Sequence, residues 1–156
     1  MKLYDAMVEI ETKLKELIPT TLHRVVLKKH LQVEGDGKKI RFANYNFMRD
    51  KKVVNIISGD NINIDYHHAH SIYRTNEIIC RFFFIDISDS VNIEKQLNDS
   101  IEIIYKKVLE NPVLPNASGI ATCVNIKYVG DNRTKGVFNN FEIVDMKFEI
   151  ILQDNV

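Results

Sequence analysis

The sequence is poor in the residues and patterns that mark specialised proteins. Its 156 residues contain 2 Cys, 3 Pro, 6 Gly and no Trp. It has no CxxC pair, repeat, linker or low-complexity tract, and so lacks the usual sequence signs of a zinc-binding, repetitive or disordered chain. With 45% hydrophobic and 27% charged residues, its composition is that of an ordinary globular protein.

Neither sign of charge is in excess, because 21 Lys and Arg residues offset 21 Asp and Glu residues. This balance argues against a strongly basic nucleic-acid-binding module and against an acidic disordered tail. No apolar run approaches the roughly 20 residues that span a bilayer, and the most apolar stretch, Ile78–Ile87, contains Arg81 and Asp86. Acidic residues near the N-terminus also interrupt the position where a signal peptide needs its apolar segment. We therefore expect one soluble intracellular domain over residues 1–156.

Two segments have the apolar periodicity of amphipathic helices. The first runs from Leu3 to Leu17 and stops before Pro19, because the residue before a proline is disfavoured in the helical region. The second follows the potential N-cap residues Ser88-Asp89-Ser90 and stops near Asn111-Pro112. Its apolar stripe consists of Ile93, Leu97, Ile101, Ile104 and Val108.

The region between these helices is rich in short β patterns. Residues 22–31 fit either a short helix or a strand, and the β-branched Val25 and Val26 favour the strand. We expect turns at Glu34–Gly37 and at Ser58–Asn61, with short strands around them over residues 39–47, 53–57 and 62–66. Because its apolar residues are few, we interpret residues 31–76 as a β-rich embellishment that orders against a partner.

The second half of the chain has clearer strands. Ile78–Ile87 is apolar on both faces, which predicts a central strand. A strand over residues 120–129, a polar hairpin loop over Gly130–Gly136 and a strand over Phe141–Leu152 follow. In the last strand we expect Val144, Met146, Phe148, Ile150 and Leu152 to face the core. The fold class is therefore α+β, a mainly antiparallel or mixed sheet with an N-terminal helix and one long helix packed on it.

His67, His68 and His70 form the one cluster with potential for metal chemistry. His68 and His70 share a face of an extended chain and could both reach a metal ion. No HExxH motif or cysteine pair accompanies them, so a polar loop or strand end is the simpler interpretation. We expect Cys80 and Cys123, which are far apart in apolar stretches, to be buried thiols. No cofactor is expected.

Other candidate motifs have ordinary structural interpretations. Ser58-Gly59 and Ser118-Gly119 lie outside any GxSxG elbow and are typical turn formers. The carboxylates of the last strand, Glu142, Asp145 and Glu149, alternate with Lys147, which is typical of cross-strand charge pairs on a surface. Because the chain lacks an evident active site, we expect a structural protein and not an enzyme.

The order of these elements resembles the tail terminator, or tail-completion, proteins of tailed bacteriophages, which include collar subunits of phage-tail-like bacteriocins. The resemblance rests on IICRFFFIDIS, the long helix VNIEKQLNDSIEIIYKKVLENP and the closing strands ATCVNIKYVGD and NNFEIVDMKFEIILQ. These segments cover about half of the chain, and the first helix adds to the match. The match is one of pattern and length, without a signature motif.

The resemblance implies a homohexameric ring that caps the tail tube, ends tube polymerisation and presents the head-joining or collar surface. The implied partners are other copies of the chain, the tail tube protein, the tail sheath and the head–tail connector, with DNA only passing through the lumen and no membrane contact. The implied location is the host cytoplasm during assembly, and then the virion or tail-like particle. The alternatives are another neck or tail-tube subunit and a small His-dependent metal-binding enzyme. The residues expected at the contact with neighbours are Val53, Ile57, Ile62, Ile64, Arg133 and Lys135.

Overall fold

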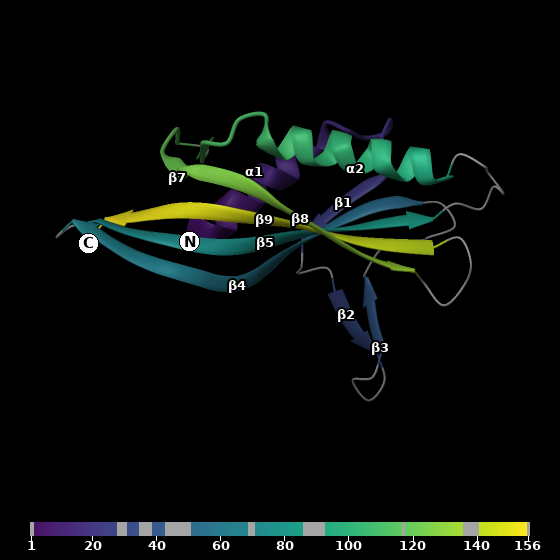
Figure 1. The fold of residues 1–156 in the computed structure, drawn as a ribbon, viewed down its shortest axis with the longest axis horizontal. Helices are drawn as coiled ribbons and strands as arrows, with labels where there is room; N and C mark the ends of the chain where they lie inside the picture. Colours follow the sequence, from purple (N-terminus) through teal and green to yellow (C-terminus); the bar gives the residue numbers. More distant parts are fainter. Residues whose placement is uncertain are drawn as a thin grey trace.

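The structure is a computed structural model, and it describes residues 2–27, 31–34, 39–42, 51–68, 71–85, 93–116, 118–135 and 141–155 (Figure 1). In parts of these ranges, including β2 and β3, only the backbone is described. The helices are α1 (Lys2–Lys15) and α2 (Ile93–Leu109). The strands are β1 (Arg24–Leu27), β2 (Leu31–Glu34), β3 (Lys39–Phe42), β4 (Lys52–His68), β5 (Ser71–Ile85), β6 (Leu114–Pro115), β7 (Ala121–Cys123), β8 (Asn125–Lys135) and β9 (Phe141–Asn155).

The main sheet has five strands in the order β1-β4-β5-β9-β8. β1 pairs with β4 in parallel, and the other neighbours are antiparallel, so the sheet is mixed and the α+β prediction is confirmed. β5 is the central strand, as its two apolar faces predicted. Phe82 on one face and Phe83 on the other are both buried.

Both helices cover the same face of the main sheet, as Figure 1 shows. The core lies between them and the sheet. The helix residues Ile10, Leu14, Leu97 and Ile104 are fully buried there, in agreement with the two predicted apolar stripes. The prediction for the last strand is also confirmed, because the inward-facing residues of β9 are all fully buried: Val144, Met146, Phe148, Ile150 and Leu152.

The opposite face of the sheet has a smaller apolar cluster near β1. It consists of Val26, Val53 and Phe83, with Ile143 packed against them. The separate β2–β3 hairpin lies on this side of the sheet (Figure 1). The turn expected at Glu34–Gly37 falls between β2 and β3, and its Gly35–Gly37 residues, like the N-cap residues 88–90, lie outside the described part of the chain.

The turn predicted at Ser58–Asn61 is wrong. β4 continues through these residues and stays paired with β5, and register shifts between Ser58 and Asn63 absorb the irregularity. Gly59 allows this pairing because a Cβ at its position would lie 2.9 Å from Glu77 Cβ, closer than side chains pack. The turn-forming composition therefore marks bulges within one long strand.

The predicted loop over Gly130–Gly136 is also largely strand. β8 runs on to Lys135, with a register shift between Tyr128 and Gly130. Gly130 has a φ of 140°, which a residue with a side chain rarely adopts, so this glycine marks a bulge. The strand expected over residues 120–129 is divided at Val124 into β7 and β8.

Candidate interaction surfaces

The residues predicted at an interface occupy different environments. Val53 is fully buried in the small apolar cluster, so its side chain is not on the surface of this chain. Ile57 is partly buried and Ile64 is 43% exposed, both on β4. Ile62 and Lys135 belong to β4 and β8, but their side chains lie outside the described part.

The β4 segment is not an embellishment beside the core. Its residues Val54 and Ile56 are fully buried against the helices, and β4 pairs with both β1 and β5. Within residues 31–76, the β2–β3 hairpin is the described part that stands apart from the main sheet. Loss of the first half of β4 would therefore remove core residues as well as surface.

Arg133 ties β8 to α2. Its Nη2 donates to Asn98 Oδ1 at 2.5 Å, and its guanidinium lies near Glu94 and Asp131 at 3.9 and 3.4 Å. Asp131 also accepts a hydrogen bond from the Tyr128 hydroxyl at 3.0 Å, and burial raises the pKa of that hydroxyl. Arg133 therefore already has several partners within the chain.

The structure places two of the three histidines at the end of β4. His67 and His68 are its last residues, and His68 pairs with Ser71 where β5 begins. Their side chains and His70, which the metal-site alternative needs, lie outside the described part of the chain. Among the side chains that are described, no three His, Cys, Asp or Glu residues could hold a metal ion together.

Both cysteines are buried free thiols, as predicted. Burial raises the pKa of Cys80 to about 12. Burial also raises the pKa of Cys123, whose Sγ donates to the Asn125 carbonyl at 2.9 Å. A thiol with a raised pKa is a poor nucleophile at neutral pH, so neither residue suits covalent catalysis.

Asp145, one of the three carboxylates singled out in the last strand, forms a cross-strand ion pair on the face away from the helices. Arg81 of β5 donates to both carboxylate oxygens of Asp145 on β9, at 2.8 and 3.2 Å. This hydrogen bonding raises the pKa of Arg81. Glu149 lies between Glu77 and Lys127 in the same sheet. Asp145 therefore has the structural role expected of a cross-strand charge pair.

The burial of Asn55 was not anticipated from the sequence. This residue of β4 lies opposite Arg81 of β5. It is fully buried, and among the described residues neither its Oδ1 nor its Nδ2 has a hydrogen-bond partner. Nothing in a short β pattern distinguishes a buried asparagine from an exposed one. Its burial depends on how β4 is placed within the sheet.

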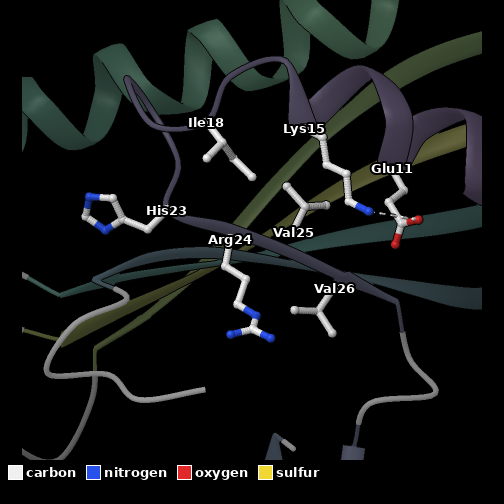
Figure 2. Close-up of a pocket in the computed structure, with 7 residues that line it drawn as sticks. All are labelled: Glu11, Lys15, Ile18, His23, Arg24, Val25 and Val26. Carbon is white, nitrogen blue, oxygen red and sulfur yellow. Dashed lines mark ion pairs between the residues drawn. The ribbon is translucent and has the colours of Figure 1, made fainter. Parts of the chain in front are cut away.

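A cavity of about 320 Å³ lies beside the outer side of β1 (Figure 2). Residues from the end of α1, the turn that follows it and β1 line this cavity: Glu11, Lys15, Ile18, His23, Arg24, Val25 and Val26. Ile18 and Val25 lie on the helix side, whereas Arg24 and Val26 point to the opposite side. No sequence pattern indicates this cavity, because it forms between α1 and β1.

Comparison with known proteins does not assign a family. Neither a protein-family model nor a curated protein sequence matches this chain. In the described part, neither helix is long and apolar enough to cross a membrane.

Proposed function

We propose that this chain is a tail terminator subunit of a phage or phage-tail-like particle. The observation that carries the proposal is the order of the elements: α1, the β4–β5 pair, the long helix α2, and the antiparallel β8 and β9. This is the plan on which the sequence resemblance rests. The proposed role is mechanical, because the ring would act by surface complementarity and not by catalysis.

Ring closure requires one patch of each subunit to contact a different patch on the next subunit. Two features of the chain support such a contact. In the described part, one edge of the sheet is formed by β1 and, beyond Ile56, by β4, and the other edge is formed by β8. The proposed contact includes Ile57, Ile62, Ile64, Arg133 and Lys135, without the buried Val53.

The remaining parts of the proposal follow from the resemblance. The ring would contact the tail tube, with the sheath and the head–tail connector as further partners, and DNA would pass through its lumen. The proposed location is the host cytoplasm during assembly and the finished particle afterwards.

A tube-length assay tests this function directly. The purified chain is added to polymerising tail-tube protein encoded beside it, and tube lengths are measured by electron microscopy. We expect the tubes to stop growing and to have a ring at one end. Native mass spectrometry should give particles of about six subunits, alone or on the tube end.

Two results would contradict the proposal. Incorporation of the chain along the whole tube would assign it as a tube subunit instead. Absence of any effect on tube length, with no ring at the tube end, would exclude the terminator role. As a control, the same amount of heat-unfolded chain should leave tube lengths unchanged.

A further inference from the structure

The second half of β4 is an edge of the main sheet. β1 pairs with β4 only along Val53–Ile56, so among the described strands Ile57–His68 has no partner on its outer side. The bulges of β4 do not end this strand, because its pairing with β5 continues to His68. The outward N–H and C=O groups of an edge strand can pair with a strand of another chain. We call residues 57–68 the free half of β4.

β8 forms the opposite edge and is similar in length to the free half of β4. It spans Asn125–Lys135, and in the described part of the chain it pairs only with β9. β4, β5, β9 and β8 alternate in direction, so β8 runs antiparallel to β4. If copies of the sheet stand side by side with their strands aligned, β8 of one copy meets β4 of the next in an antiparallel arrangement.

The two edges have opposite formal charge. The free half of β4 contains Asp60 and Asp65 and neither Lys nor Arg. β8 contains three cationic residues and one acidic residue: Lys127, Arg133, Lys135 and Asp131. An acidic edge and a basic edge on the same chain are complementary when one copy follows another.

Two of these charges are available for a contact with another copy. Asp60 and Lys127 are both exposed, and neither side chain has a hydrogen-bond or ion-pair partner among the residues that the structure describes. Lys127 lies opposite Glu149 in the register of β8 and β9, without an ion pair between them. Arg133, in contrast, is already bonded to Asn98. Lys127 is therefore the described basic residue of β8 that is open to a new partner.

The charges also favour one pairing over the two symmetric alternatives. If the free halves of β4 from two copies paired with each other, aspartates would lie near aspartates. If two β8 strands paired, lysines would lie near lysines. Like charges across a strand pair are destabilising. Only the pairing of β8 with β4 joins opposite charges, and it uses a different patch on each copy, as a closed ring requires.

We propose that β8 of one copy pairs antiparallel with the free half of β4 of the next copy, so that the main sheet continues from subunit to subunit. Because β1 occupies the side of β4 as far as Ile56, the incoming β8 is displaced along β4, and the junction is staggered. This inference rests on the proposed ring and specifies which strands form its contact.

The test reverses the charge of each edge in a separate variant of the full chain. Asp60→Lys with Asp65→Lys gives a chain whose two edges are both basic. Lys127→Glu with Lys135→Glu gives a chain whose two edges are both acidic. Each variant alone should need at least about threefold more protein for half-assembly than the wild type, because attraction is replaced by repulsion. An equal mixture should assemble like the wild type.

Native mass spectrometry measures the assemblies, with one variant isotopically labelled. The mixture should give rings that contain equal numbers of the two variants, because each edge then meets its opposite. The control is Lys95→Glu on α2, whose side chain is 76% exposed, and it should assemble like the wild type. Thermal unfolding checks that each variant is folded, and the single substitutions Asp60→Lys and Lys127→Glu replace the double variants if they are not.

Hydrogen exchange tests the backbone pairing itself. In the assembled wild type, alternate amides within Ile57–His68 and Asn125–Lys135 should exchange more slowly than in the monomer, because they become hydrogen-bonded across the junction. Amides of β1 should be unchanged. Assembly without this added protection would show that the contact is not strand pairing and would overturn the proposal.

The remaining outcomes separate this contact from the terminator role. Variants that assemble alone as well as the wild type, or a mixture that does not recover, would overturn the contact. A wild type that assembles in this way without stopping tube growth would contradict the terminator role only. If the wild type assembles only on tube ends, the same variants and mixture are compared by tube length. A wild type that neither assembles nor stops tubes would contradict both.

Discussion

Cys80 on β5 and Asn55 on the neighbouring β4 are fully buried, although both side chains have polar atoms. They lie on opposite faces of the sheet. Cys80 is in the large core under the helices, whereas Asn55 is beside Arg81 on the other face. A thiol is readily buried as a small apolar group, but an amide without hydrogen bonds destabilises the folded state. The two residues therefore give different predictions.

The Cys80 thiol should make stability depend on alkaline pH. Its pKa is about 12 in the folded chain against 9.0 for an unperturbed thiol, so the unfolded state releases this proton first as the pH rises. The stability that the neutral Cys80 thiol contributes to the folded state is fully present below pH 9. This stability is lost as the pH rises towards 12, by up to about 1.4 kcal/mol per pH unit. Urea unfolding should show the stability difference between wild type and Cys80→Ala shrinking above pH 9. A difference that stays constant up to pH 10.5 would contradict burial of this thiol.

Asn55→Leu should stabilise the protein. Leu has the same branching as Asn, and it removes two buried polar atoms that lack partners in the part of the chain that the structure describes. We expect this change to raise the free energy of unfolding by about 1–3 kcal/mol. Asn132→Leu is the matched control, because Asn132 is exposed at the end of the same cross-strand row. It should alter stability by less than about 0.5 kcal/mol. Urea unfolding measures both. Destabilisation by Asn55→Leu would indicate that the amide binds water or another group.

At the scale of elements, α2 is the clearest case of a helix that packs by its apolar stripe. Leu97, Ile101 and Ile104 lie within the core, and Ile103 lies on the outer face. Lys13 of α1 secures the end of α2, because its Nζ donates to the carbonyls of Val108 and Asn111 at 2.9 and 2.7 Å. Cations bound to the last carbonyls stabilise a helix terminus.

Ile101→Asp should abolish folding, whereas Ile103→Asp should not. Ile101 is 4% exposed and Ile103 is 43% exposed on the same helix. An unpaired buried carboxylate costs several kcal/mol, a large part of a total stability of about 5–15 kcal/mol. Solubility and circular dichroism on expression of the two variants distinguish them. A soluble Ile101→Asp protein with a cooperative unfolding transition would show that this face of α2 is not in the core.

At the scale of the whole molecule, the strands differ in how many neighbours support them. β5 has β4 on one side and β9 on the other, each in a long antiparallel ladder. Among the described strands, β2 and β3 pair only with each other, as a hairpin separate from the main sheet. An isolated two-stranded hairpin is marginally stable in water. Local stability should therefore be lowest at this hairpin and highest at β5.

Hydrogen exchange followed by mass spectrometry should show this gradient. We expect amides of β5 around Cys80 and Phe82 to exchange only on global unfolding, and amides of β2 and β3 to exchange far faster. The measurement is made on the full chain without partners. If β2 and β3 are as well protected as β5, then the hairpin must be supported by contacts that its strand pairing does not provide.

The candidate sites were only partly predictable from the sequence. The buried state of Cys80 and Cys123 followed from their apolar surroundings, and the pairing of Asp145 followed from the alternation of charges in β9. The burial of Val53 did not follow, because a β-rich run does not show which of its residues lie inside a sheet. The cavity at β1 was not predictable either, since its lining comes from residues 11–26 only after α1 and β1 have packed together.

The sequence by itself determined the elements that have a strong local pattern. The stripes of α1 and α2, the doubly apolar β5 and the alternation in β9 each specify which side chains avoid water, whatever the rest of the chain does. Only the tertiary structure decided that Ser58–Asn61 and Gly130–Lys135 continue as strands. Their composition favours turns, but pairing with β5 and β9 supplies hydrogen bonds along the whole ladder, and bulges absorb the irregular residues. Local propensities are weak against a full set of backbone hydrogen bonds, and those bonds depend on partners distant in the sequence.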